Sequence, residues 1–330
     1  LGELLQSLEL IDEETLRRLW TEANRQRRTL RQVLLASGAI TLYQLALIEA
    51  GTLDALMLGR LRVIDRLRVT PKETVYRVFD PLHSEGPSHG QIILRQLSEA
   101  ETEDATHPDE FRQRFAAAAQ IQHPNLQATV EVFELAGRPA VLQEWLQAIP
   151  GSEWPAAVAI PGVWLKLLTE AARGLSAIHE AGLIHGRLIA DSFLLTPTGT
   201  VKLSGFADPP WLLAGPSPEG DTSPASDLRA LGQIASGWIQ LSQAIPTGKK
   251  RGSRAKAFPE QLAMLLRRLE ADIDTPMADT APGAEPYQSA SELLQDCERL
   301  ATIFPCRPTD WAELIHALSG DDASESRRSA

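Results

Sequence analysis

The sequence predicts an α+β protein with two lobes, a small β-rich lobe followed by a mainly helical lobe, and a small all-α module in front of both. Three observations support this prediction. Leucines at helical spacing run through residues 1–56, strand-like runs mark residues 58–146, and amphipathic helices dominate residues 147–318. A polar tail covers residues 319–330.

The all-α module is predicted from its helix caps. Asp12 is a good N-cap for a first helix with Leu16, Leu19 and Trp20, and a second helix covers residues 30–36. Thr41 starts a third helix, where Gln44 completes a capping-box pattern. The pattern of apolar residue, cap and leucine at 11–16 recurs at 40–45, which indicates a weak repeat. We expect a docking or packing role for this small bundle.

The β-rich lobe is predicted as antiparallel strands around one helix. Ala136 and Gly137 supply the turn of the last hairpin, and residues 68–73 are expected to form an ordinary surface turn. The expected strands cover residues 61–67, 74–79, 91–97, 126–135 and 138–142, and the helix covers 109–120.

The helical lobe is predicted from a long helix and a short hairpin. Residues 164–181 have helical periodicity and end at Gly182, which is typical of a helix stop. Two short apolar runs at 192–195 and 201–203 flank a Pro- and Gly-containing turn. Further helices are expected over residues 258–270, 287–294 and 310–318.

Composition excludes several classes of protein. The net charge of −11 argues against general binding to nucleic acid or to anionic membranes. No apolar run reaches the roughly 20 residues of a membrane span, and the start lacks a signal-peptide pattern. Cys297 and Cys306 are expected to be idle thiols in a reducing compartment, so we expect a cytoplasmic protein. The chain begins at Leu1, so it is interpreted as a possible piece of a longer protein.

The stretch 183–207 resembles the catalytic core of eukaryotic-type protein kinases. In that family the loop has the pattern H-R-D-L-x-x-x-N, and a D-F-G tripeptide follows. Here the loop is His185-Gly186-Arg187-Leu188 with Ser192 at the Asn position, and the tripeptide is Gly205-Phe206-Ala207. The resemblance covers about residues 58–300 and implies a two-lobed protein-kinase-like fold.

Four positions resemble the structural anchors of the family. His185 is expected to hold the loop by hydrogen bonds, and Phe206 is the aromatic residue of the tripeptide. Glu219 falls at the glutamate of the A-P-E motif. Asp227, in a Ser-Asp-x-x-x-Leu-Gly phrase, would brace the backbone of the loop.

The residues that carry phosphoryl transfer in the family are replaced. Transfer needs a carboxylate to orient the nucleophile and oxygen ligands to hold Mg²⁺. Arg187, Ser192 and Gly205 stand at those three positions, and a guanidinium cannot accept a hydrogen bond. Asp191 and Asp208 are the nearest carboxylates, and they fall short of a usual Mg²⁺ site. We expect no metal.

The nucleotide-binding positions of the first lobe have changed as well. Arg95 stands at the phosphate-binding lysine, and Arg114 falls at the glutamate that should pair with it, so two arginines are expected to face each other. The remaining positions of this vestigial cleft are the glycine-loop residues Arg68, Thr70 and Glu73, the gatekeeper Gln143, and the hinge residues Glu144 and Trp145.

The resemblance implies a pseudokinase, a catalytically inactive kinase homologue that acts as a protein-binding or regulatory scaffold. We expect a protein partner, no cofactor and no Mg-ATP. An alternative is metal-independent nucleotide binding by Arg95 and Arg187.

A second alternative is ligand sensing by the N-terminal repeat. That segment is similar to helical regions in front of planctomycete-type bacterial serine/threonine kinases. It also resembles the N-terminal module of secretion and pilus ATPases, some of which bind cyclic dinucleotides.

Overall fold

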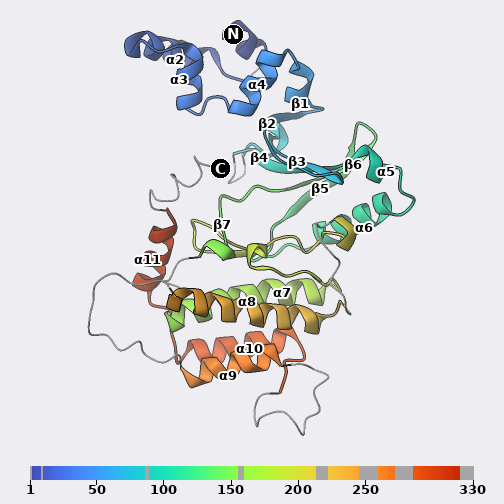
Figure 1. The fold of residues 1–330 in the computed structure, drawn as a ribbon, viewed down its shortest axis with the longest axis vertical. Coiled ribbons are helices and arrows are strands. Elements are labelled where there is room, and N and C mark those ends of the chain that lie inside the picture. The colour runs from blue at the N-terminus through green and yellow to red at the C-terminus, as the bar shows by residue number, and fades with distance from the viewer. Residues whose placement is uncertain are drawn as a thin grey trace. The chain divides into compact units, whose positions relative to one another are not determined.

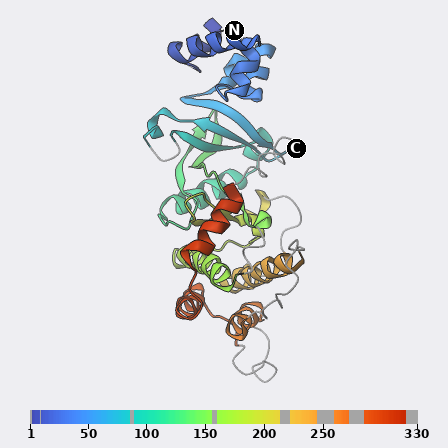
Figure 2. The same ribbon diagram turned by 90° about the vertical axis from the view of Figure 1, so that its left-hand side faces the viewer.

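A computed structural model of the chain describes residues 2–8, 10–85, 89–154, 160–212, 222–244, 259–271 and 285–319. The chain divides into two compact units, and each is described by itself. The first contains Leu1–Pro108 and Glu131–Trp145, and the second contains Asp109–Val130 and Leu146–Ala330. Figure 1 shows the elements coloured along the chain, and Figure 2 shows them after a quarter turn.

The first unit begins with helices whose ends follow the predicted caps. Asp12 accepts a hydrogen bond from the backbone N–H of Thr15, and both Thr29 and Thr41 form complete capping boxes. The equivalent repeat residues Ile11 and Ile40 are both buried. Trp20, however, is more than half exposed. The helices are α1 (Gly2–Ser7), α2 (Glu13–Gln26), α3 (Leu30–Ala36) and α4 (Leu42–Ala50), followed by the 3₁₀ turn η1 (Leu53–Leu56).

The first unit also holds most of a six-stranded sheet in the order β1-β2-β3-β4-β6-β5. Its strands are β1 (Met57–Leu58), β2 (Leu61–Val69), β3 (Glu73–Phe79), β4 (Gln91–Leu97), β5 (Thr129–Leu135) and β6 (Arg138–Glu144). The paired strands β1 to β4 and β6 run antiparallel, and one sheet face packs around Val63, Val78 and Leu94. Between β5 and β6, Ala136 and Gly137 both have positive φ, which suits a tight hairpin turn.

Two helices lie between β4 and β5 in the sequence. The short helix α5 (Glu99–Thr102) follows β4, and α6 (His107–Ala119) begins two residues before the predicted helix. The predicted strand at 126–135 starts only at Thr129. Leu126 instead forms an isolated parallel bridge with Leu203 in the second unit.

The second unit is mainly helical around one small sheet. Its helices are α7 (Pro161–Glu180), α8 (Pro224–Ala244), α9 (Glu260–Glu270), α10 (Ala290–Ala301) and α11 (Pro308–Ser319). The sheet contains β7 (Ile149–Pro150), β8 (Phe193–Leu195) and β9 (Val201–Leu203) in that order. In the described part of the chain, no helix is long and apolar enough to cross a membrane.

Helix α7 is the centre of the second unit, as most of its residues are buried. It packs against α10 and β9, and Figure 1 shows α8 beside it. Trp164 is completely buried, and its indole N–H donates to the backbone carbonyl of Ala235 in α8 at 3.0 Å. Gly174 lets α7 approach the loop at Asn125, whose side-chain amide donates to the carbonyl of Val201 at 2.8 Å. This packing fixes the loops at one end of α7.

Gly174→Ala should destabilise the protein by about 1–3 kcal/mol, because the pocket around it is already full. An added Cβ would lie 2.7 Å from the backbone oxygen of Asn125. The matched control is Gly237→Ala in α8, where no atom lies within 4 Å of the added Cβ. There alanine should stabilise the helix by up to about 1 kcal/mol. Urea unfolding measures both, and equal effects would contradict the close packing.

Candidate functional site

The candidate site in the first unit is a row of polar side chains on three neighbouring strands. Arg95 of β4 lies diagonally between Glu73 of β3 and Gln143 of β6, because Glu73 pairs with Leu97 and Gln143 pairs with Ile93. The Nε of Arg95 donates to Oε2 of Glu73 at 2.9 Å, and its Nη2 donates to Oε1 at 3.1 Å. Its Nη1 lies 3.4 Å from Oε1 of Gln143.

This ion pair is buried. The side chains of Arg95 and Glu73 are only 7% and 3% exposed. Such a pair is stable only when its charges and hydrogen-bonding atoms are satisfied, and the bidentate geometry does this. The prediction that residues 68–73 form an ordinary surface turn is therefore wrong for Glu73, whose carboxylate turns inward to meet Arg95.

The other glycine-loop positions close the β2–β3 hairpin. Thr70 donates its backbone N–H to the carbonyl of Glu73 at 2.9 Å, and its hydroxyl accepts from the N–H groups of Lys72 and Glu73. Arg68, which is more than half exposed, adds a second guanidinium to the Glu73 carboxylate. The turn is thus held by its own side chains.

The hinge residues end the first unit. Trp145 is half-buried, and the guanidinium of Arg77 lies 5.1 Å from the centre of its ring. The indole nitrogen of Trp145 is buried without a hydrogen-bond partner among the described residues. Glu144, the last residue of β6, pairs with Ile92. These contacts agree with a packing role for the tryptophan.

In the second unit, the loop that carries His185 is fastened to α8. Asp227 accepts hydrogen bonds from the backbone N–H groups of His185 and Gly186, each at 2.9 Å. The ring of His179 reaches the same carboxylate at 2.9 Å. The Nε2 of His185 lies 3.0 Å from the carbonyl of Ser204, to which it donates. The imidazole of His185 therefore fixes the position of the backbone at Ser204.

Three residues in and after this loop, Arg187, Ser192 and Gly205, stand at the positions that the resemblance assigns to a catalytic carboxylate and two metal ligands. Ser192 is buried, and its hydroxyl accepts from the backbone N–H of Ile189 at 3.2 Å. Arg187 is half-buried. Gly205 has a φ of +81°, a left-handed conformation that side chains other than glycine adopt only with strain. Phe206, which follows it, is buried.

Helix α6 is tied to the same segment. Arg114 donates to the backbone carbonyls of Ala207 at 3.2 Å and Phe206 at 3.4 Å. One turn earlier, Glu110 accepts a hydrogen bond from the indole of Trp211 at 2.7 Å. The sequence predicted that Arg114 would face Arg95, but the structure gives each arginine acceptors within its own unit.

The acidic residues considered as metal ligands are not gathered into a metal site. Asp191 accepts a hydrogen bond from the hydroxyl of Ser152, and Asp208 is buried next to Gly205. Among the described residues, no group of three or more His, Cys, Asp or Glu side chains could hold a metal ion. Glu219 lies outside the described residues.

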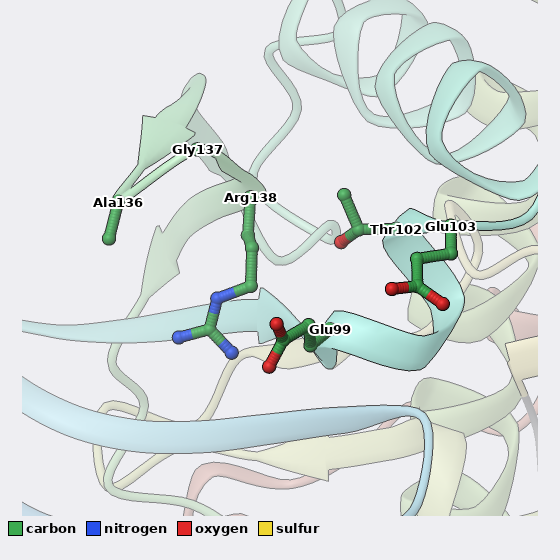
Figure 3. A pocket seen from close by; sticks show the side chains of 6 residues that line it. All are labelled: Glu99, Thr102, Glu103, Ala136, Gly137 and Arg138. Atoms are coloured by element: carbon green, nitrogen blue, oxygen red, sulfur yellow. The ribbon is translucent and has the colours of Figure 1, made fainter.

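Two features of the first unit had no motif to reveal them. One is the pairing of Glu73 with Arg95, for which the only signal was opposite charges two positions apart on adjoining strands. The other is an open pocket of about 500 Å³ between α5 and the β5–β6 turn, in which Arg138 points toward Glu99 (Figure 3). The pocket is lined by Glu99, Thr102, Glu103, Ala136, Gly137 and Arg138.

Comparison with known proteins identifies the fold. No protein-family model matches the sequence, and no curated protein does. A point-mutant kinase domain of PknI from Mycobacterium tuberculosis matches with a TM-score of 0.51 and 22% identity, over 74% of this chain and 97% of that chain. The fold is that of a protein kinase domain. A second structure of the PknI kinase domain matches with a TM-score of 0.50 and 23% identity, over the same shares. The predicted kinase-like fold is confirmed.

Glu73→Gln should lower the free energy of unfolding by about 3–5 kcal/mol, because it leaves a buried arginine without its carboxylate. The matched control is Asp65→Asn. The Nη2 of Arg77 in β3 lies 3.9 Å from the Oδ2 of Asp65 in the neighbouring strand β2, but both side chains are partly exposed. That variant should cost at most about 1 kcal/mol. Urea unfolding compares the two, and similar losses would contradict the buried ion pair.

Burial lowers the pKa of His185 below its usual value of 6.5, although Asp227 opposes this effect. In the unfolded chain His185 binds a proton near pH 6.5, whereas in the folded protein it stays neutral to a lower pH. The free energy of unfolding should therefore fall as the pH drops below about 6.5. The slope for one proton is at most about 1.4 kcal/mol per pH unit. Urea unfolding at pH 7.5 and 5.5 should show a smaller drop for His185→Gln. An equal drop would show that another group is responsible.

Proposed function

We propose that the chain is a catalytically inactive kinase homologue that works by binding a protein partner. The observation that carries this proposal is the buried pair of Arg95 and Glu73. In a kinase-like fold, the cation at this strand position holds nucleotide phosphates. Here the chain supplies its own carboxylate to that cation, so a phosphate would have to displace Glu73 from a satisfied, buried ion pair.

The loop of the second unit supports the same proposal. Arg187 offers no acceptor to a substrate hydroxyl, and Gly205 offers no carboxylate to a metal. Ser192 keeps a hydroxyl at the position of a metal ligand, but that hydroxyl accepts a hydrogen bond from Ile189. Mg²⁺ favours carboxylate oxygens, and these residues supply none.

The architecture that surrounds these positions is nevertheless maintained. Asp227 fixes the loop at His185 and Gly186, and Arg114, although it stands at a changed position, joins α6 to the segment at Phe206. A fold that keeps its anchors without its reactive groups retains shaped surfaces, which is what a scaffold needs. This is the reason for proposing a binding or regulatory role.

The alternative of a metal-independent phosphate clamp is less well supported. It requires Arg95 to offer its N–H groups to a ligand, whereas its Nε and Nη2 both donate to Glu73. The alternative of a ligand-sensing repeat rests only on the sequence pattern shared by residues 11–16 and 40–45.

We expect that millimolar ATP or ADP, with or without Mg²⁺, leaves the melting temperature unchanged, because Arg95 already donates to the Glu73 carboxylate. A ligand present at 100 times its Kd would add about 2.7 kcal/mol to stability, which differential scanning fluorimetry detects easily. Arg95→Ala serves as the control.

Two outcomes would contradict the proposal. A shift that requires Mg²⁺ would mean that oxygen ligands other than those named hold the metal, and catalysis would have to be assayed directly. A shift without Mg²⁺ that disappears in Arg95→Ala would favour the phosphate clamp.

A further inference from the structure

We propose that the N-terminal helices α1 to α4 control the order of the β2–β3 hairpin through the first turn of α4. The hairpin consists of residues 61–79, and its tip carries Glu73. All of these residues belong to the first unit. The contact needs no ligand, so this proposal stands independently of the proposed function.

The contact is made by a capping box that has two tasks. Within α4, Gln44 accepts a hydrogen bond from the N–H of Thr41 at 3.0 Å, and Thr41 accepts one from the N–H of Gln44 at 3.1 Å. Toward the sheet, the Thr41 hydroxyl donates to the carbonyl of Ile64 at 2.6 Å, and the Gln44 amide donates to that of Val63 at 2.8 Å. Gln44 is only 6% exposed, so these bonds are shielded from water.

The two carbonyls can be reached together because β2 has a bulge at Ile64. Val63 pairs with Val78 and Asp65 pairs with Arg77, which leaves Ile64 without a partner residue. In a regular strand successive carbonyls point to opposite edges, so a single helical turn could not hold both. A bulge removes this alternation. Helix α4 therefore donates its hydrogen bonds to the bulged part of β2.

Beyond the bulge, the β2 strand of the hairpin has little apolar support. Residues 66–69 of β2 are exposed, including Leu67 and Val69. Tyr43 of α4 packs against the sheet core, and the guanidinium of Arg66 lies 5.3 Å from the centre of its ring. Because β3 is paired with β4 along its whole length, the outer part of β2 is the weakly supported strand, and it depends on its pairing with β3, on α4 at its base and on the ion pair of Glu73 at its tip. Few buried contacts and polar anchors are typical of a segment that opens locally.

The consequence is a mechanical link between the helices and Glu73. Anything that moves α4 away from β2 exposes two carbonyls, releases the bulge and loosens the strand that leads to Glu73. The helices therefore influence the conformation of the hairpin, and they would not behave as an independent domain.

The chain contains a matched control for this proposal. Thr29 and Gln32 form the same capping box at the start of α3, with cap hydrogen bonds of 3.0 and 3.3 Å. Both residues are exposed, and among the described residues their side chains hydrogen-bond only to each other's backbone. Glutamate at either position can still accept the cap hydrogen bond, but Gln44→Glu loses the donor to Val63 and sets a carboxylate against its carbonyl.

The test is amide hydrogen exchange of the full chain, compared for Gln44→Glu and Gln32→Glu. We expect the amides of residues 65–75 to exchange about 5- to 30-fold faster in Gln44→Glu, the factor for a loss of one to two kcal/mol. Gln32→Glu should leave them unchanged, and β4 and β6 should stay protected in both variants.

Equal exchange of the hairpin in the two variants would overturn the proposal. So would a uniform loss of protection across β3, β4 and β6 in Gln44→Glu, since the contact would then merely stabilise the whole unit. If Gln44→Glu does not fold, Gln44→Met, which has a similar shape without the amide, is judged by the same selective pattern.

Discussion

The first unit is governed by the need to neutralise a buried guanidinium. Arg95 lies in the middle of the sheet, where a charge without a partner is very costly. The antiparallel register places Glu73 and Gln143 on either side of it, so that the strand pairing and the electrostatics depend on each other. The turn at Thr70 then holds the backbone of Glu73, and the outer guanidinium of Arg68 adds a second ion pair to its carboxylate. One charged pair thus connects the sheet register and the hairpin turn.

The second unit shows which parts of a kinase-like fold are independent of its chemistry. The backbone anchors are hydrogen bonds between groups that any stable loop needs, such as the Asp227 carboxylate and two backbone N–H groups. They lower the cost of burying the loop and are useful whether or not a substrate is present.

The sequence predicted the helices of the N-terminal repeat and the strand β4 closely, because caps and apolar periodicity are local signals. It predicted the kinase-like fold through the order and spacing of degraded motifs. It did not predict the partners of Arg95 and Arg114, since these depend on register and on contacts between residues far apart in the chain. The same limit explains why β5 starts late: Leu126 is drawn into a bridge with Leu203 that no local pattern announces. The surface turn predicted for residues 68–73 misses the partner of Glu73, because a partner across the sheet depends on strand register.

The positive φ of Gly205 imposes a backbone cost on any other residue at this position. An aspartate at that position has enough room, since the nearest atom to an added Cβ, an oxygen of Asp208, is 3.8 Å away. Its backbone, however, would have to leave the left-handed region or remain there at a cost of about 1–2 kcal/mol. A favourable substitution would therefore need the peptides on either side to rotate as well as a change of side chain. Gly205 thus fixes the path of the backbone between β9 and Phe206.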